Sequence, residues 1–234
     1  MFERVRHQRI GHVLEALDAA ILRAHRCWFG GGTAIALKYG EYRESVDIDF
    51  LVSDLAGYRG LRHLLTGVQG IAALARNGPP WEQPRETRAD QYGIRALLVV
   101  QEFKIKFEIV LEGRMALAMP ADTDRICGIA TLTTLDLLAS KLLANSDRWG
   151  DGGVFSRDVI DLAMMQPKLP VLRQAVAKAQ QAYGDAVLRD LGKAIDHMKT
   201  REGWLEHCMQ ALAISVPRAV VWQRLRALER ILPS

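Results

Sequence analysis

Hydrophobic positions along the chain follow two different periods, and the change between them divides the sequence. In residues 10–24, apolar side chains recur every three or four positions, which predicts one helix with a single buried face. Residues 46–52 alternate apolar and polar side chains before they become continuously apolar, which predicts a strand. Two more strand-like stretches, 94–100 and 103–111, are separated by only two residues, so they are expected to pair as a hairpin.

Glycines interrupt the first half, whereas the second half reads as helices. A short apolar run at 27–29 stops at Gly30-Gly31-Gly32, and Thr33 is placed to cap a helix over 34–39. The other expected helices share the helical period and cover 58–68, 134–144, 156–165, 169–183, 186–199, 204–214 and 217–231. The predicted fold class is therefore α+β, with a small mixed-sheet domain over 1–125 and an all-helical domain over 126–234.

Composition narrows the class of protein only slightly. The 234 residues are 49% hydrophobic and 25% charged, as in ordinary globular proteins, and the net charge of +4 is a modest lean toward polyanions. Three scattered cysteines form neither a disulfide framework nor a metal-binding cluster. The chain lacks an apolar run of membrane-spanning length and begins without a secretory signal pattern, so a cytoplasmic protein without a membrane segment is expected.

Two aspartates in the predicted strand are the first candidate for chemistry. Asp47 and Asp49 alternate with apolar residues, and residues two apart in a strand face the same way. Aspartate is disfavoured in strands, and two adjacent negative charges repel each other. A divalent cation would stabilise the pair, and Mg²⁺ prefers a few carboxylate oxygens together with substrate phosphates.

A third acid is expected from the strand over 103–111. Its aromatic and aliphatic residues alternate toward the core, which places Lys104, Lys106 and Glu108 on the opposite face. Glu108 would join Asp47 and Asp49 if the two strands are neighbours. Glu102 and Glu112 share its parity but lie near the strand ends, so they are weaker candidates.

The glycine turn is a candidate phosphate site. A strand, a tight glycine turn and a helix N-terminus present unpaired backbone N–H groups to an anion, and glycine lets the backbone approach closely. Gly31, Gly32 and the Thr33 hydroxyl are therefore expected to hold the β- and γ-phosphates of a nucleotide. The turn does not match the P-loop, because no Gly-Lys-Ser/Thr follows it.

Together these segments resemble a known enzyme family. Gly-Gly-Thr-Ala from Gly31, followed by Arg-x-Ser-x-Asp-Ile-Asp-Phe from Arg43, is similar to the DNA polymerase β-type nucleotidyltransferase superfamily and within it to the AbiEii/AbiGii-type toxin group. Leu-x-x-Leu-x-x-Leu-x-x-Lys ending at Lys141 resembles that group's helix with an essential lysine. Arg157-Asp158-Val-Ile-Asp161-Leu resembles its Arg-Asp-x-x-Asp-Leu helix.

The resemblance implies an enzyme that transfers a nucleotide from a nucleoside triphosphate to an acceptor hydroxyl. Asp47, Asp49 and Glu108 would hold two Mg²⁺ ions for an in-line displacement, with Glu108 as a possible proton acceptor. Residues implied to contact the nucleotide or line its pocket are Gly31, Gly32, Thr33, Arg43, Ser45, Lys141, Arg157 and Asp158. In this family-based picture the helical domain closes the active-site cleft, and Lys141 reaches the triphosphate.

Several alternatives stay open at the level of sequence. Lys141 could be a surface lysine on an apolar helix, and Arg157 with Asp161 could be an ordinary i,i+4 salt bridge. The resemblance suggests a toxin that modifies an RNA, such as a tRNA 3′ end, and that has a cognate antitoxin. A small-molecule acceptor, or a catalytically silent nucleotide- or RNA-binding regulator, are the rival hypotheses. Base preference, the number of nucleotides added and the oligomeric state are not encoded in any recognisable motif.

Overall fold

The computed structural model describes residues 2–233, which divide into two compact units. The first, here called the sheet unit, runs up to Glu41 and resumes from Ser45 to Thr133. The second, the helical unit, comprises Tyr42–Glu44 and the chain from Thr134 onward. This division falls at Thr133, whereas the pattern of elements placed it at residue 125. The chain passes from the sheet unit into the helical unit at Tyr42 and back into the sheet unit at Ser45. The assignment of domains to 1–125 and 126–234 stays a prediction.

The sheet unit is built on five strands in the order β1-β2-β5-β4-β3. These are β1 (Trp28–Gly30), β2 (Ile48–Val52), β3 (Arg88–Ala89), β4 (Gly93–Val100) and β5 (Phe103–Leu111). Strands β2 and β5 run parallel, and the other pairs are antiparallel. The expected hairpin is confirmed: Val100 pairs with Phe103, and both residues of the turn between them have positive φ, as a type I′ turn requires.

One face of this sheet forms the core of the unit. The rings of Phe29, Phe50 and Phe107 follow one another across β1, β2 and β5, with centroids 5.6 and 5.5 Å apart. All three side chains are fully buried. In β5 the buried positions alternate with Lys104, Lys106 and Glu108, as the sequence predicted. The polar side chains of β2 and β5 must therefore lie on the other face of the sheet.

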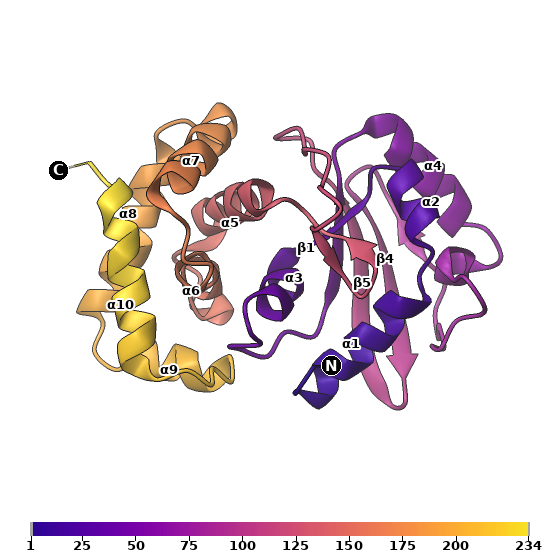
Figure 1. The fold of residues 1–234 in the computed structure, drawn as a ribbon, viewed down its shortest axis with the longest axis horizontal. Coiled ribbons are helices and arrows are strands. Elements are labelled where there is room, and N and C mark those ends of the chain that lie inside the picture. Colours follow the sequence, from indigo (N-terminus) through magenta and orange to yellow (C-terminus); the bar gives the residue numbers. More distant parts are fainter. Residues whose placement is uncertain (1, 234) are drawn as a thin grey trace. The chain divides into compact units, whose positions relative to one another are not determined.

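Helices and short strands complete the sheet unit (Figure 1). They are α1 (Val5–Ala16), α2 (Ala19–Ala24), α3 (Gly31–Lys38), α4 (Leu55–Leu65), the 3-10 helix η1 (Gly70–Leu74) and the two-stranded β6 (Arg125–Ile126) and β7 (Ile129–Ala130). The single helix predicted over 10–24 is wrong, because Asp18 caps α2 by accepting from the N–H groups of Ala20 and Ile21. A side chain that satisfies the first N–H groups of a new helix favours a break at that point.

The glycine turn also differs from its prediction. Helix α3 begins at Gly31, so Thr33 lies inside the helix and does not cap it. Strand β2 begins at Ile48, which leaves Asp47 just before the strand. Gly30 takes the N-cap position without a side chain, and an added Cβ there would come within 2.7 Å of Leu51. Close packing of the turn against β2 therefore lets the helix start earlier than the capping rule suggested.

The helical unit consists of helices, which Figure 1 shows in salmon to yellow. They are α5 (Thr134–Arg148), η2 (Gly152–Val154), α6 (Arg157–Met164), α7 (Leu169–Tyr183), α8 (Ala186–Thr200), α9 (Trp204–Ala211), α10 (Arg218–Leu228) and η3 (Glu229–Ile231). Helix α5 packs against α6, α7 and α8. The predicted α+β class, a mixed sheet followed by helices, is confirmed. Among residues 2–233, every helix is too short or too polar to be a candidate for crossing a membrane.

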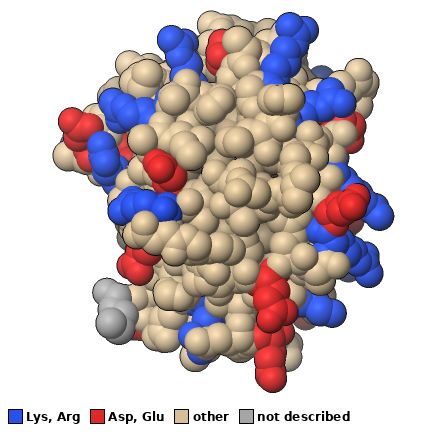
Figure 2. Space-filling view, turned by 90° about the vertical axis from the view of Figure 1, so that its right-hand side faces the viewer, with Lys and Arg blue, Asp and Glu red and all other residues tan. Residues whose placement is uncertain are grey.

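Charged side chains on the sheet unit are mixed in sign on the face that Figure 2 shows. The centre of this face is uncharged, and Lys and Arg side chains lie around its edge with Asp and Glu side chains among them. The fields of neighbouring opposite charges largely cancel at a distance, and salt further screens exposed charges beyond about 10 Å. The net charge of +4 therefore does not by itself mark this face as a site for a polyanion.

Candidate active site

A lateral row of residues crosses the polar face of the sheet and contains two of the three predicted acids. The strand register places Gly30 beside Asp49, Asp49 beside Glu108, and Glu108 beside Arg95. Residues directly paired in neighbouring strands have their side chains about 5 Å apart on the same face. Asp49 and Glu108 therefore lie side by side, as the parity of the two strands predicted. Asp47 is the residue directly before the first residue of β2.

Gly31 packs directly against the carboxylate of Asp49. Its φ of +67° is in the left-handed region, and an added Cβ would lie 2.8 Å from the Cβ of Asp49 and closer still to its Oδ2. Only glycine tolerates both conditions. The turn that opens α3 is thereby held against the first acid of the row, and the N–H groups at the start of α3 lie at the same place.

Glu108 is held by two cations. Arg95 Nε donates to Glu108 Oε1 at 2.7 Å, and Lys106 Nζ lies 2.6 Å from Glu108 Oε2. The hydrogen bond to Glu108 raises the pKa of Lys106, and the nearby charges of Asp49 and Asp47 raise it further. Lys106 thus provides a positive charge for all three carboxylates, which offsets the repulsion between neighbouring acids.

The donor set suits a hard divalent cation. Asp47, Asp49 and Glu108 offer only carboxylate oxygens, the ligands that Mg²⁺ prefers, and the glycine at position 31 lets the backbone approach Asp49 closely. Within residues 2–233, however, no three His, Cys, Asp or Glu side chains are gathered closely enough to form a metal site. The expected convergence of three acids is therefore seen as a pair, Asp49 and Glu108, with Lys106 as counterion.

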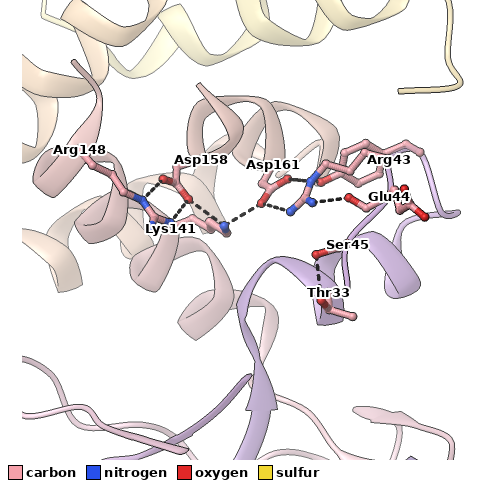
Figure 3. Close-up of polar contacts among 9 residues, drawn as sticks. Thr33, Arg43, Glu44, Ser45, Lys141, Arg148, Asp158 and Asp161 are labelled. Carbon is pink, nitrogen blue, oxygen red and sulfur yellow. Dashed lines mark hydrogen bonds and ion pairs between the residues drawn. The ribbon is translucent and has the colours of Figure 1, made fainter. Parts of the chain in front are cut away.

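A second polar network fixes the segment that leads into Asp47. Thr33 Oγ1 and Ser45 Oγ are 2.8 Å apart, so the Thr33 hydroxyl predicted for a phosphate is engaged by Ser45 (Figure 3). Ser45 N–H donates to Nε2 of the fully buried His7 at 3.1 Å, and His7 Nδ1 lies 2.7 Å from Glu41. Because Nε2 accepts, Nδ1 must carry the proton and donate to Glu41.

His7 is a residue that sequence reasoning missed. It lies near the N-terminus, outside every motif, and 38 residues before its partner Ser45. The six histidines are dispersed along the sequence, so composition offered no signal. A polar residue on the apolar face of the N-terminal helix was the available clue, since a buried histidine needs partners for both ring nitrogens.

In the helical unit, Asp161 is the centre of a buried charge cluster. Arg43 donates to both of its oxygens, from Nε at 2.7 Å and from Nη2 at 2.9 Å, and Lys141 Nζ lies 2.7 Å from Oδ2 (Figure 3). The hydroxyl of Tyr42 donates to Oδ1. Asp161 is fully buried, and the neighbouring Arg43 and Lys141 charges outweigh burial and lower its pKa.

Asp158 extends the same cluster. Its carboxylate accepts from Lys141 Nζ at 2.8 Å and from Arg148 Nε at 2.7 Å. Burial opposes ionisation of Asp158, but the charges of Lys141 and Arg148 hold its pKa well below the ordinary value. With Arg43, Lys141 and Arg148 against two aspartates, the cluster carries one positive charge in excess.

These contacts change the interpretation of three predicted residues. Lys141 is only 5% exposed and is the counterion of two buried carboxylates, so it is not the surface lysine considered as an alternative. Its role as a ligand of the triphosphate stays a prediction. Asp161 pairs with Arg43 and Lys141, so an i,i+4 salt bridge to Arg157 is not its structural role. Arg157 is half-buried at the first position of α6, and its role toward a nucleotide is untested.

The sequence matches the model of a defined family. A family model described as the nucleotidyl transferase AbiEii toxin of type IV toxin–antitoxin systems matches residues 12–220. The chain belongs to this family. It is accordingly a nucleotidyltransferase, and the predicted family membership and enzyme class are confirmed.

Comparison with other proteins adds two structures. A candidate nucleotidyltransferase from H. pylori is 16% identical, with 96% of each chain covered and a TM-score of 0.44. JHP933 from Helicobacter pylori is 14% identical, with 98% of this chain and 97% of that chain covered and a TM-score of 0.43. No curated protein matches the sequence.

The contact between Gly31 and Asp49 leads to a testable prediction with a matched control. Gly31→Ala and Gly40→Ala each place a Cβ at a positive φ, which costs about 1–2 kcal/mol of stability. Only Gly31 faces Asp49, whereas a Cβ at Gly40 meets open space. We therefore expect Gly31→Ala to lower nucleotidyl transfer about a hundredfold, since small displacements of reacting groups have effects of this size. Gly40→Ala should leave the rate unchanged; equal rates in the two variants would show that the contact is not needed.

Proposed function

We propose that the chain transfers a nucleoside monophosphate from a nucleoside triphosphate to an RNA, as a cytoplasmic toxin that is restrained by a cognate antitoxin. The observation that carries the catalytic part is the pairing of Asp49 with Glu108 on adjacent strands, beside the glycine turn at Gly31. Family membership supports the toxin and the nucleotide substrate. The RNA acceptor and the metal are part of the proposal.

Each residue of the row has a role in this proposal. Asp47, Asp49 and Glu108 would hold two Mg²⁺ ions. Such ions stabilise the attacking and leaving oxygens of a phosphoryl displacement. The backbone N–H groups of Gly31 and Gly32 face the triphosphate at the start of α3. Lys106 is exposed and balances the negative charge of the acids. When bound cations take over that role, the positive charge of Lys106 becomes available to the phosphates.

The remaining predicted residues belong to two polar networks, one in each unit. Ser45 is held through its backbone by His7 and through its hydroxyl by Thr33, which fixes the chain immediately before Asp47. In the helical unit, Arg43, Lys141 and Asp158 belong to one ion cluster, whose excess positive charge favours a bound triphosphate. We assign Arg157, at the start of α6, to the same nucleotide-binding role.

The test is a transfer assay with purified protein. The protein is incubated with Mg²⁺, total RNA and each α-labelled nucleoside triphosphate in turn, and products are separated by size. We expect label in RNA with one or more of the four nucleotides, and none after chelation of the metal. Label in a small molecule would support the alternative acceptor instead. Failure of every nucleotide to transfer label, with bound nucleotide or RNA still detectable, would support the silent binding regulator.

A further inference from the structure

We propose that a cationic pocket on the sheet unit binds the phosphate backbone of the RNA acceptor. The inference rests on the proposed function, because it names the surface by which that acceptor is held. The pocket, here called the α1–β5 pocket, has a volume of about 310 Å³. It is lined by Arg6, Arg9, Ile10, Val46, Glu102, Phe103, Lys104 and Ile105.

The charge of this pocket is predominantly positive. Arg6, Arg9 and Lys104 face one carboxylate, that of Glu102. Arg6 and Arg9 are three residues apart on α1 and so lie on the same side of the helix. Cations and acids alternate on the face shown in Figure 2, which makes this local excess distinctive. The volume lies at the lower end of the range for small-ligand sites, about 300–1,000 Å³, and suits one nucleotide unit of a strand.

The two arginines are suited to a phosphate. Arg9 Nε is buried and lacks a hydrogen-bond acceptor within residues 2–233, and a buried unpaired N–H group is costly. In this proposal the Arg9 side chain turns toward the pocket when RNA binds, so that its planar guanidinium donates two parallel hydrogen bonds to a phosphate. Arg6 lies 5.9 Å from the centroid of the Phe103 ring, a cation–π contact that holds its guanidinium at the pocket.

Lys104 links the pocket to the face of β5 that carries the acid row, whereas Phe103 and Ile105 line the pocket from the other face of the strand. Val46, one of its lining residues, directly precedes Asp47. Lys104, Lys106 and Glu108 lie on the same face of β5, so a row of cations leads from the pocket to the acids. Lys104 and Glu108 are four positions apart on β5, which corresponds to a distance of about 13 Å at about 3.3 Å per residue. In this proposal, an RNA bound at the pocket follows Lys104 and Lys106 along β5 and brings its terminal nucleotide to the acids.

The position of Lys104 and Lys106 on the face of the acids favours RNA over an acidic peptide as the occupant. Both would supply negative charge to the arginines. Only the nucleic acid also offers the acids a terminal ribose hydroxyl, the group that nucleotidyl transfer requires. The acidic peptide is retained as a competitor in the test.

The experiment measures binding of a labelled single-stranded RNA by fluorescence anisotropy over a series of salt concentrations, without nucleoside triphosphate. The pocket variant is Arg6→Gln/Arg9→Gln/Lys104→Gln. Its matched control is Arg59→Gln/Arg62→Gln/Arg85→Gln, which removes the same charge from exposed positions of the sheet unit. For single strands the logarithm of the binding constant falls with the logarithm of salt by about 0.7 per phosphate contact. We expect the pocket variant to lower this slope by about 2, and the control to retain it.

Equal slopes in the two variants would overturn the proposal, as would a wild-type protein that fails to bind RNA or that exchanges RNA for polyglutamate at equal charge concentration. Circular dichroism verifies that each variant is folded. If the triple variant is not, Lys104→Glu alone, on an exposed strand position, should reduce affinity at least tenfold. Binding is measured without triphosphate, so it does not depend on transfer. RNA binding through the pocket, together with failure of the separate transfer assay, would contradict the proposed function alone. Label transfer to RNA with equal slopes would contradict the pocket alone.

Discussion

Asp49→Asn should lower the rate of nucleotidyl transfer by about a thousandfold or more, which corresponds to about 4 kcal/mol of transition-state stabilisation. Asp49 is the acid that the structure places between the glycine turn and Glu108. The amide keeps the size of the side chain but removes the charge that would bind a divalent cation. Loss of a charge that stabilises the transferring phosphoryl group has effects of this order. Initial rates of label transfer at saturating nucleotide and RNA provide the measurement.

Stability distinguishes this effect from damage to the fold. Glu108 keeps Arg95 and Lys106 as partners, and the amide has the size of the carboxylate, so Asp49→Asn should leave the melting temperature nearly unchanged. The control is Asp122→Asn, because Asp122 is 86% exposed in the sheet unit and lies outside the acid row. A variant of Asp49 that retains more than a tenth of the wild-type rate would contradict the assignment of this row as the active site.

The second large effect concerns stability of the helical unit. We expect Asp161→Ala to lower the free energy of unfolding by about 3–5 kcal/mol, a substantial part of the 5–15 kcal/mol typical of a folded protein. The side chain is fully buried and accepts from Arg43, Lys141 and Tyr42. Its removal leaves Arg43 buried without its carboxylate partner and raises the excess positive charge of the cluster.

Urea denaturation followed by helical circular dichroism measures this loss. Hydrogen exchange of peptides from α5 and α6 shows whether the destabilisation begins in the helical unit. The control is Asp196→Ala on α8, since Asp196 is exposed and a surface substitution changes stability by about 0.5 kcal/mol at most. A loss below 1 kcal/mol for Asp161→Ala would mean that solvent or another carboxylate satisfies Arg43. The cluster would then not be a structural centre of this unit.

Much of the candidate site was predictable because its signals are local. Alternation along β5 placed Glu108 on the polar face, and the same two-residue period paired Asp49 with that face. The two-residue turn predicted the β4–β5 hairpin. The glycine turn and the Arg-Asp-x-x-Asp-Leu helix are short motifs whose residue types are restricted by their chemistry, so their resemblance to the nucleotidyltransferase family is visible in the sequence.

Predictions of hydrogen-bond and ion-pair partners failed where a side chain had both a local and a distant partner within reach. The sequence offered Asp161 a partner one helical turn away in Arg157. In the folded chain it pairs with Arg43, 118 residues distant. Thr33 had the residue type of a helix cap, yet its hydroxyl is engaged by Ser45 inside α3. The apolar pattern runs without interruption through residues 10–24, yet Asp18 caps a new helix, α2, within it.

The sequence by itself determined which residue types stand on which face of each strand and helix, because side-chain direction follows from backbone period alone. The periods thus indicated the strands, the helical second half and the face of the candidate acids, and the short motifs indicated the family by resemblance. Only the tertiary structure decided the partners of those side chains: Lys106 and Arg95 at Glu108, His7 at Ser45, and Arg43 at Asp161. A buried charge or polar group takes whichever partner the packed chain brings within hydrogen-bond distance, and that proximity is a property of the whole fold.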